Sequence, residues 1–469
     1  MKKIIILLMI GFTTTAVASI DRSQQPISGP APTIQLGKPQ TFTLKNGLKV
    51  IVVTNNKLPR AYASLDIDNP PDYEGDIKGV SSLVSSLMGN GTTTIPKEEF
   101  NEEVDFMGAT ISLSASGGYA SSLTRFFPRV LELMADALLH PIFLEEEFNK
   151  QKAILIENVR SNEKNVQRVA GRVASKITYG DKHPFGEFLT IESLTAIKLA
   201  NVENYYQTFA RPNNAYLIIV GDVDFNDVKQ HVTTLFSQWK KTKIPTSKWP
   251  KPKKKKSNIV YFVDMPNAVQ TEIFIRNTIP ISMAHPDYFA LKLANQILGG
   301  SSTARLFMNL REDKGYTYGS YSSVATSRYT GLFSAKARVR NDVTAASIKE
   351  MVTEINTIIA EPVTLAELSA VKEKFVGNFI MSTERPATIA SFALNIDQLN
   401  LPDNFYETYI QQFQNVTIAD IQQVTQKYIL KDQLNIIVVG KGSDILDGLK
   451  SLDYPIVHLN TYADKKLLD

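Results

Sequence analysis

The sequence predicts an α+β fold made of two similar domains joined by a linker rich in lysine and proline. Helical and strand patterns occur in runs that do not strictly alternate, which is typical of α+β proteins. The outline of the first half recurs in the second half. Between them, residues 240–256 hold nine Lys, three Pro and no acidic residue. We therefore expect an N-terminal domain at 39–239, a linker at 240–257 and a C-terminal domain at 258–469.

The composition is that of an ordinary globular protein. The chain has 469 residues, of which 43% are hydrophobic and 21% charged, and it contains no cysteine. At roughly 100–200 residues per domain, this length suits two to four domains. The composition excludes intrinsic disorder and a disulfide scaffold. Without cysteine, a thiol nucleophile and cysteine-ligated zinc are also excluded.

Residues 1–18 are predicted to be a secretory signal peptide. Two lysines precede an apolar run at 4–12, and Ala16, Val17 and Ala18 form a small-residue cleavage pattern. No later segment has roughly 18 uncharged apolar residues in a row, so we expect no transmembrane anchor after cleavage. The prediction is a periplasmic protein whose residues 19–38 are flexible. An uncleaved membrane anchor is the alternative interpretation.

The basic net charge is local. The formal charge is +4, but outside the signal peptide and residues 240–256 there are 40 basic and 47 acidic residues, a net charge of −7. The lysine-rich segment could contact nucleic acid or anionic lipid. Proline and mutually repelling charges are also what extends an inter-domain linker. We interpret the segment as a linker and expect no nucleic-acid partner, because an exported protein rarely meets nucleic acid.

Each half is predicted to begin with an apolar strand and to end with a helix, a polar turn and a buried strand that stops at glycine. Between these ends lie helical patterns with apolar residues on one face, and short alternating segments. The first half contains a strand at 48–53, a helix at 79–88, a strand at 110–114, a helix at 144–162 and a final strand ending at Gly221.

The second half repeats this order of patterns. It contains a strand at 259–263, a helix at 287–298, a strand at 331–337, a helix at 345–359 and a final strand ending at Gly440. This repetition favours two duplicated domains over one larger fold.

Four segments carry a family resemblance, in order along almost the whole mature chain. They are 43–50 (TLKNGLKV), 182–186 (KHPFG), 211–223 (RPNNAYLIIVGDV) and 298–318 (LGGSSTARLFMNLREDKGYTY). Together they resemble the insulinase/pitrilysin-like zinc metallopeptidases, specifically the two-domain proteins that work as pairs of chains. The resemblance implies two insulinase-like domains similar to those of mitochondrial processing peptidase.

The zinc motif of that family is missing. Active members carry HxxEH on their first helix, where two His bind zinc and Glu activates a water molecule. In this chain Ser82, Ser85 and Ser86 stand at the positions of the first His, the Glu and the second His, while Glu157 matches a more distant zinc ligand. Serine hydroxyls are poor zinc ligands and cannot act as a general base at neutral pH. The resemblance therefore implies a degenerate site and no metal in this chain.

A replacement site within the chain is not expected. The five histidines lie at least 43 positions apart. Neither a Gly-x-Ser-x-Gly elbow nor a Ser-x-x-Lys pair surrounds the three serines, so a serine nucleophile is not predicted either.

The second half keeps residues that active members direct at the substrate. Arg311 matches an arginine, and Tyr318 a tyrosine, that bind or polarise the scissile carbonyl; Tyr316 is the competing assignment for the tyrosine. A guanidinium can bind a peptide carbonyl, and a phenol can donate to an oxyanion. The alternative is that Arg311 pairs with Glu312 or Asp313 and the tyrosines only pack.

Gly299, Gly300 and Ser301 are a candidate substrate loop. They resemble, in shorter form, the glycine-rich loop of the non-catalytic subunit of mitochondrial processing peptidase. The alternative is a helix-capping turn, in which Ser301 or Ser302 is the N-cap.

The expected function is that of a non-catalytic, substrate-binding subunit of a periplasmic heteromeric zinc metallopeptidase. The resemblance implies an HxxEH-bearing sister chain that holds the zinc, and peptide substrates that add to a sheet edge. A non-enzymatic structural or scaffold protein on the same fold is the alternative. A self-sufficient peptidase with another metal site is the third possibility.

Overall fold

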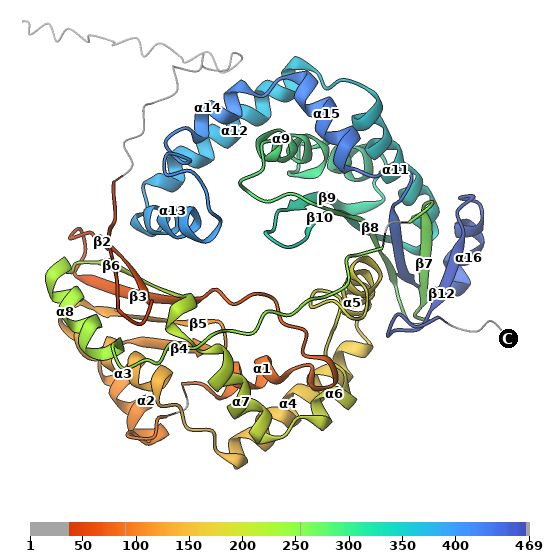
Figure 1. Ribbon diagram of the computed structural model, residues 1–469. Coiled ribbons are helices and arrows are strands. Elements are labelled where there is room, and N and C mark those ends of the chain that lie inside the picture. The colour runs from red at the N-terminus through yellow and green to blue at the C-terminus, as the bar shows by residue number, and fades with distance from the viewer. Residues whose placement is uncertain (1–36, 90, 254, 466–469) are drawn as a thin grey trace, which may run out of the picture. The chain divides into compact units, whose positions relative to one another are not determined.

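Two six-stranded mixed sheets organise the chain. The computed structural model describes residues 37–89, 91–253 and 255–465. In spatial order, the first sheet contains β1 (Gln40–Thr43), β2 (Lys49–Thr54), β6 (Ala215–Gly221), β3 (Arg60–Ile67), β5 (Gly117–Leu123) and β4 (Thr110–Ser114) (Figure 1). The second contains β12 (Ile456–Leu459), β7 (Ile259–Asp264), β11 (Asn435–Gly440), β8 (Gln270–Ile279), β10 (Gly331–Arg340) and β9 (Thr317–Ala325).

Five strands of each sheet follow one plan, which confirms the prediction of two similar α+β halves. The sixth strand differs, because β1 pairs antiparallel with β2 whereas β12 pairs parallel with β7. In each, the opening strand pairs in parallel with the last central strand, β2 with β6 and β7 with β11. That central strand then pairs antiparallel with β3 or β8. Every residue of β6 and of β11 is buried. Strands covered on both faces are continuous apolar runs in the sequence, and this pattern predicts both strands.

Helices of the first half cover one face of its sheet. The helix α3 (Phe127–Leu139) packs on β5, β4 and β3, and α8 (Phe225–Phe236) packs beside α3. The helix α1 (Val80–Leu87) lies against α7 (Leu199–Phe209), α4 (Glu145–Glu163) and β4. The first half also contains the helices α2 (Lys97–Phe106) and α6 (Ile191–Ala196). The predicted helices at 79–88 and 144–162 correspond to α1 and α4.

Helices of the second half repeat this layer. The helix α9 (Tyr288–Gly299) packs on β9 and α11 (Thr344–Ala360) packs on β10. They correspond to the predicted helices at 287–298 and 345–359. Packed around them are α12 (Leu365–Thr383), α14 (Tyr409–Asn415), α15 (Ile418–Tyr428) and α16 (Gly442–Lys450). The predicted strand at 331–337 is part of β10, which continues to Arg340 because it pairs with β8 along its whole length.

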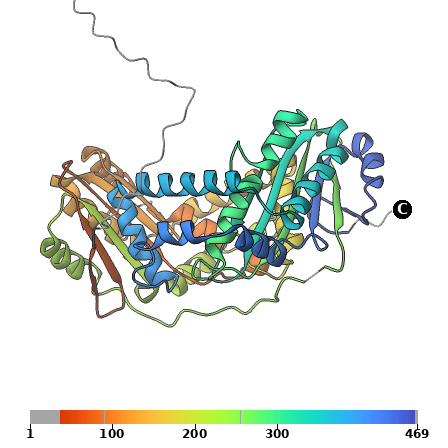
Figure 2. The same ribbon diagram turned by 90° about the horizontal axis from the view of Figure 1, so that it is seen from above.

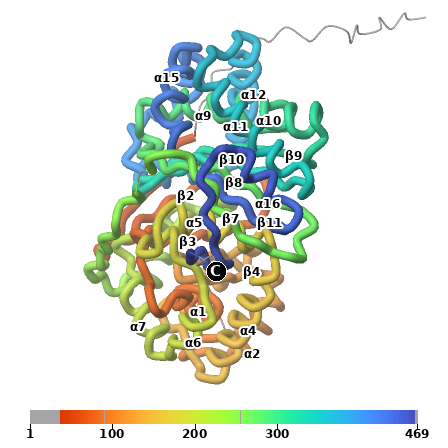
Figure 3. Tube along the Cα trace, turned by 90° about the vertical axis from the view of Figure 1, so that its right-hand side faces the viewer, coloured from red at the N-terminus to blue at the C-terminus, as the bar shows by residue number. Residues whose placement is uncertain are grey.

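One helix from each half packs on the sheet of the other half. The helix α5 (Val166–Tyr179) lies on β8 and β11, and α13 (Pro386–Gln398) lies on β2 and β6. The two are equivalent, because α5 follows α4 as α13 follows α12. Figure 3 shows α5 beside the C-terminal segment, where Lys176 Nζ donates to the Tyr462 carbonyl at 3.0 Å. All described residues accordingly belong to one compact unit.

The segment between α8 and β7 has no helix or strand among its described residues, and Figure 2 shows it as extended chain. The domain limits at 239 and 258 remain predictions. None of the helices among the described residues is both long and apolar enough to cross a bilayer. The predicted signal peptide at 1–18, and most of the segment 19–38, lie outside the described residues.

Candidate functional site

The helix α1 has one apolar side that packs in the core and one polar side. Val80, Leu83, Val84 and Leu87 are buried at helical spacing. Gly79 precedes the helix at φ 112°, where an added Cβ would lie 2.7 Å from two leucine methyl groups, so only glycine fits there. The opposite side of α1 is half-buried and carries the three serines of the degenerate motif.

The serine hydroxyls are bound to backbone groups. Ser85 Oγ donates to the Ser81 carbonyl at 2.8 Å and accepts the Ala115 N–H at 3.0 Å. Ser86 Oγ donates to the Ser82 carbonyl at 3.0 Å. Serine readily makes such bonds to the carbonyl four residues earlier in a helix. Two of the three positions therefore have hydroxyl partners within the fold itself.

Glu157 does not complete a metal site. Although α4 packs on α1, the Glu157 side chain is 71% exposed and pairs with Arg160 at 3.3 Å. Within the described residues, no group of three or more His, Asp or Glu side chains could hold a metal ion. Three hydroxyls and one exposed carboxylate do not fit a zinc ion, which needs imidazole, thiolate or several carboxylate ligands.

A buried pair of carboxylates holds the start of α1, and sequence reasoning missed it. Glu74 accepts the Gly79 N–H at 2.7 Å and the Ser81 hydroxyl at 2.6 Å. Glu187 accepts the backbone N–H of Glu74 at 3.1 Å and pairs with Lys78 at 3.1 Å. Burial raises the pKa of Glu187, and Lys78 opposes that shift. Carboxylates at a helix start are stabilised by its dipole. The only sequence signal was a glutamate directly after the 182–186 loop.

In the second half the structure brings Arg311 and Tyr318 together. Arg311 lies in the π-helical segment η4 (Met308–Asp313), and Tyr318 lies at the start of β9, an edge strand. The guanidinium carbon is 5.4 Å from the Tyr318 ring centre. Tyr318 is 85% exposed, whereas Tyr316 is partly buried and donates its backbone N–H to Leu310 at 2.9 Å. The geometry thus pairs Arg311 with Tyr318; the role of the pair stays a prediction.

The alternative interpretation, an ion pair for Arg311 and packing for the tyrosines, is met only in part. The ion pair of Arg311 with Glu312 is present but long, 3.7 Å from Nε to Oε1, and the arginine side chain is 42% exposed. Such an exposed pair contributes little to stability. Tyr318 is far too exposed to serve packing. Both side chains are therefore accessible to a ligand.

The glycines at the end of α9 are explained by close packing. A Cβ on Gly299 would come 2.3 Å from the Ser322 backbone nitrogen of β9, and one on Gly300 would meet Gln296 Cα at 2.7 Å. Ser301 Oγ lies 3.1 Å from Thr303 Oγ1. Whether Gly299, Gly300 and Ser301 contact substrate stays a prediction.

The alternative interpretation, in which Ser301 or Ser302 caps the next helix, is wrong. The helix α10 (Arg305–Phe307) begins later, with Ala304 at its N-cap and no side-chain cap. Ala304, the N-cap residue, is buried. A serine two or three positions earlier cannot reach the first N–H groups of the helix.

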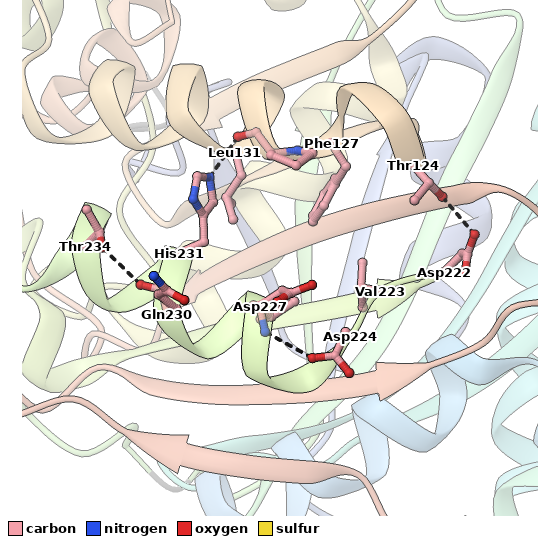
Figure 4. Close-up of a pocket in the computed structure, with 12 residues that line it drawn as sticks. Thr124, Phe127, Leu131, Asp222, Val223, Asp224, Asp227, Gln230, His231 and Thr234 are labelled. Carbon is pink, nitrogen blue, oxygen red and sulfur yellow. Dashed lines mark hydrogen bonds between the residues drawn. The ribbon is translucent and has the colours of Figure 1, made fainter.

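A pocket of about 470 Å³ lies elsewhere, between α3 and α8 (Figure 4). Its polar groups serve the fold. Asp222 accepts from the Thr124 hydroxyl at 3.4 Å, and Asp224 accepts two N–H groups in the first turn of α8. His231 Nε2 lies 3.0 Å from the Pro128 carbonyl. None of the lining residues comes from α1, α4 or the second half, so this pocket is separate from the predicted site.

Comparison with known proteins gives the family. Residues 49–188 match the family described as Insulinase (Peptidase family M16). Residues 196–375 match the Peptidase M16 inactive domain. The chain belongs to peptidase family M16. The predicted resemblance to insulinase-like metallopeptidases is thereby confirmed.

Other M16 proteins match over most of their length. The zinc protease PqqE of Helicobacter pylori is 23% identical over 426 residues, which cover 85% of this chain and 92% of PqqE. The uncharacterized zinc protease YmxG of Bacillus subtilis is 23% identical over 350 residues, or 73% of this chain and 84% of YmxG.

Solved structures share the M16 fold. The crystal structure of a peptidase M16 inactive domain from Pseudomonas fluorescens matches with a TM-score of 0.75 and 23% identity, over 86% of this chain and 98% of that one. The crystal structure of a protease from Helicobacter pylori matches with a TM-score of 0.77 and 20% identity, over 86% of this chain and 99% of that one. At these identities the likeness is one of fold.

Proposed function

We propose that this M16 chain is the non-catalytic, substrate-binding subunit of a periplasmic heteromeric zinc metallopeptidase. It supplies Arg311 and Tyr318 to the zinc site of an HxxEH-bearing sister chain that cleaves peptides. The observation that carries the proposal is the contrast between the two halves. Of the three serines at the positions of the zinc motif, Ser85 and Ser86 bond to carbonyl groups one turn earlier, whereas the arginine–tyrosine pair is exposed.

The chemistry assigned to the pair follows from its groups. The Arg311 guanidinium has five N–H donors, and its long ion pair with Glu312 leaves donors for a peptide carbonyl. The exposed phenol of Tyr318 can donate to the oxygen on which negative charge develops as the peptide bond is attacked. The zinc ion and the activated water belong to the sister chain. Family membership supports this assignment, because the M16 relatives are named zinc proteases.

The sheet edges support peptide binding. The strands β4 and β9 lie at the edges of the two sheets, β4 against α1 and β9 next to Arg311. An edge strand presents unpaired backbone groups to which an extended peptide can add. Main-chain hydrogen bonds then supply the affinity, with little selectivity for side chains.

The proposal is tested by assaying peptide cleavage with this chain alone, with an HxxEH sister chain alone and with both. We expect cleavage in the mixture to exceed that of either chain, and zinc only in the sister chain. Arg311→Ala should lower kcat/KM of the mixture by roughly 10²-fold, as loss of an oxyanion donor does. Arg125→Ala is the matched control, because Arg125 is also exposed and lies over an aromatic ring, 4.7 Å from the Phe126 ring centre, but in the first half.

Two outcomes contradict the proposal. Zinc and cleavage in this chain alone would establish a self-sufficient peptidase. Full activity of an intact complex that carries Arg311→Ala would favour the structural or scaffold role instead.

A further inference from the structure

The segment between the two halves carries lysines that pair with no carboxylate among the described residues. The lysine strip is defined here as the eight described lysines of this segment: Lys240, Lys241, Lys243, Lys248, Lys251, Lys253, Lys255 and Lys256. Seven of them are exposed, and Lys255 lies 5.5 Å from the Tyr261 ring centre. The lysine ion pairs in the described part of the chain all involve lysines outside the strip.

The strip is anchored to the folded protein between its lysines. Ser247 Oγ donates to the Asp72 carboxylate at 2.6 Å. Two positions on, the Trp249 ring packs against His183 at 5.5 Å and Tyr329 at 5.9 Å between centroids. The serine and the tryptophan thus face the protein while the neighbouring lysines remain exposed. The extended course of the segment can be followed in Figure 2. These contacts make the strip a fixed surface feature rather than a loose tether.

The charge of the strip contrasts with the rest of the protein. Outside this segment and the predicted signal peptide, the chain has a net charge of −7. The body nevertheless does not neutralise the strip, so its ammonium groups are available to an external polyanion. Lysine is a compact point charge without the planar fork with which arginine reads individual phosphates or bases. Lysines along an extended segment suit a diffuse, planar array of negative charge.

We infer that the lysine strip docks this protein on an anionic phospholipid bilayer. Clusters of four to eight basic residues bind such surfaces, and each basic residue near the surface adds to the affinity. Trp249 is packed within the fold, so docking is electrostatic and reversible, without insertion of an apolar anchor. The acidic body is repelled by the same surface, which orients the protein with the strip toward the lipid. This inference does not depend on the peptidase role.

The test is co-sedimentation of the mature chain with vesicles of phosphatidylglycerol and phosphatidylcholine, and with vesicles of phosphatidylcholine alone. We expect binding to the first and not to the second, and release at high salt, because salt screens exposed charges. Lys248→Gln, Lys251→Gln, Lys253→Gln and Lys256→Gln together should weaken binding at least about tenfold.

A matched control distinguishes the effect of the lysine strip on binding from the effect of the net charge of the protein. Lys57→Gln, Lys164→Gln, Lys349→Gln and Lys374→Gln remove the same charge from four exposed lysines outside the strip, and binding should be unchanged. An equal loss in both variants would overturn the inference, as would absence of binding to phosphatidylglycerol vesicles. Tighter binding to duplex DNA than to the vesicles would make the strip a nucleic-acid surface instead.

Discussion

At the residue scale, α1 packs as a core helix although serines occupy three positions on its polar side. The buried side of α1 still packs into the core, while Ser85 and Ser86 bond to carbonyl groups one turn earlier. Ser85 also binds the loop after β4 through the Ala115 N–H. Small hydroxyl side chains satisfy themselves in this way, whereas imidazoles would have to be held by a metal or a second partner. The packing of α1 therefore does not depend on metal ligands at these positions.

Restoring the motif tests this reading of α1. Ser82→His, Ser85→Glu and Ser86→His together should create a chain that binds one zinc ion, because α1 still lies against α4, which carries Glu157. Loss of the bond to Ala115 should cost about 1 kcal/mol of stability. Metal analysis after dialysis measures the zinc. The same triple variant with Glu157→Gln should bind zinc more weakly. A folded triple variant without zinc would show that α1 is not the relic of a zinc helix.

At the element scale, the segment that bears Arg311 is tied to a neighbouring helix. Arg305 in α10 donates to both carboxylate oxygens of Glu367 in α12, at 2.7 and 3.0 Å. Glu367 also accepts the Thr364 N–H at 2.9 Å and closes the capping box of α12. Burial alone would raise the pKa of Glu367, but the bonds from Arg305 and Thr364 outweigh it and lower the pKa to about 2.

The pH dependence of stability should change in Glu367→Gln. The pKa of Glu367 is 4.5 when unperturbed and about 2 in the fold, so the unfolded chain binds more protons between these values. The ionised Glu367 carboxylate thus stabilises the fold above pH 4.5. This contribution to the free energy of unfolding is lost as the pH falls toward 2. In urea unfolding, the free energy of unfolding of the variant should be well below that of the unchanged protein at pH 7, and the difference should become smaller toward pH 3. Glu373→Gln, on the exposed side of α12, is the control. A deficit independent of pH would contradict the assignment.

At the scale of the whole molecule, the exchange of α5 and α13 makes each half depend on the other. In α5, Val169, Ala170, Val173 and Ala174 are buried among residues of the second sheet. In return, Ala390 of α13 is buried against Ile51, Ile218 and Val220 of the first sheet. Each sheet face would otherwise expose apolar side chains to water. Cooperative unfolding of both halves follows from this arrangement.

Val173→Asp places an unpaired carboxylate at a fully buried position of α5. We expect it to lower the free energy of unfolding by about 3 kcal/mol or more, with both halves lost in one transition. Thermal unfolding followed by circular dichroism and tryptophan fluorescence measures this. Gln167→Asp, at an exposed position of the same helix, should have little effect. Two separate transitions in the Val173 variant, with one half unaffected, would argue against the coupling.

Much of the fold was predictable because its signals are local. Strands such as β6 and β11 are continuous apolar runs that end at glycine, and α4 and α11 follow their apolar periodicity to within a residue or so. The alternative of a serine N-cap after α9 is wrong, because α10 begins at Arg305 with Ala304 as its N-cap, two positions beyond Ser302. Residue type alone does not show at which of these positions the helix begins.

The sequence by itself determined the class of fold, the duplication of its halves and the absence of HxxEH from the segment of Ser82, Ser85 and Ser86, since each depends on residue identity or short-range spacing. Only the tertiary structure decided which residues meet over long separations. Glu74 and Glu187 meet at the start of α1, and each of α5 and α13 packs on the sheet of the other half. Such contacts form because apolar faces must be covered and buried charges must be paired, and many chain segments could satisfy either need. Which segment does so is settled when the chain packs.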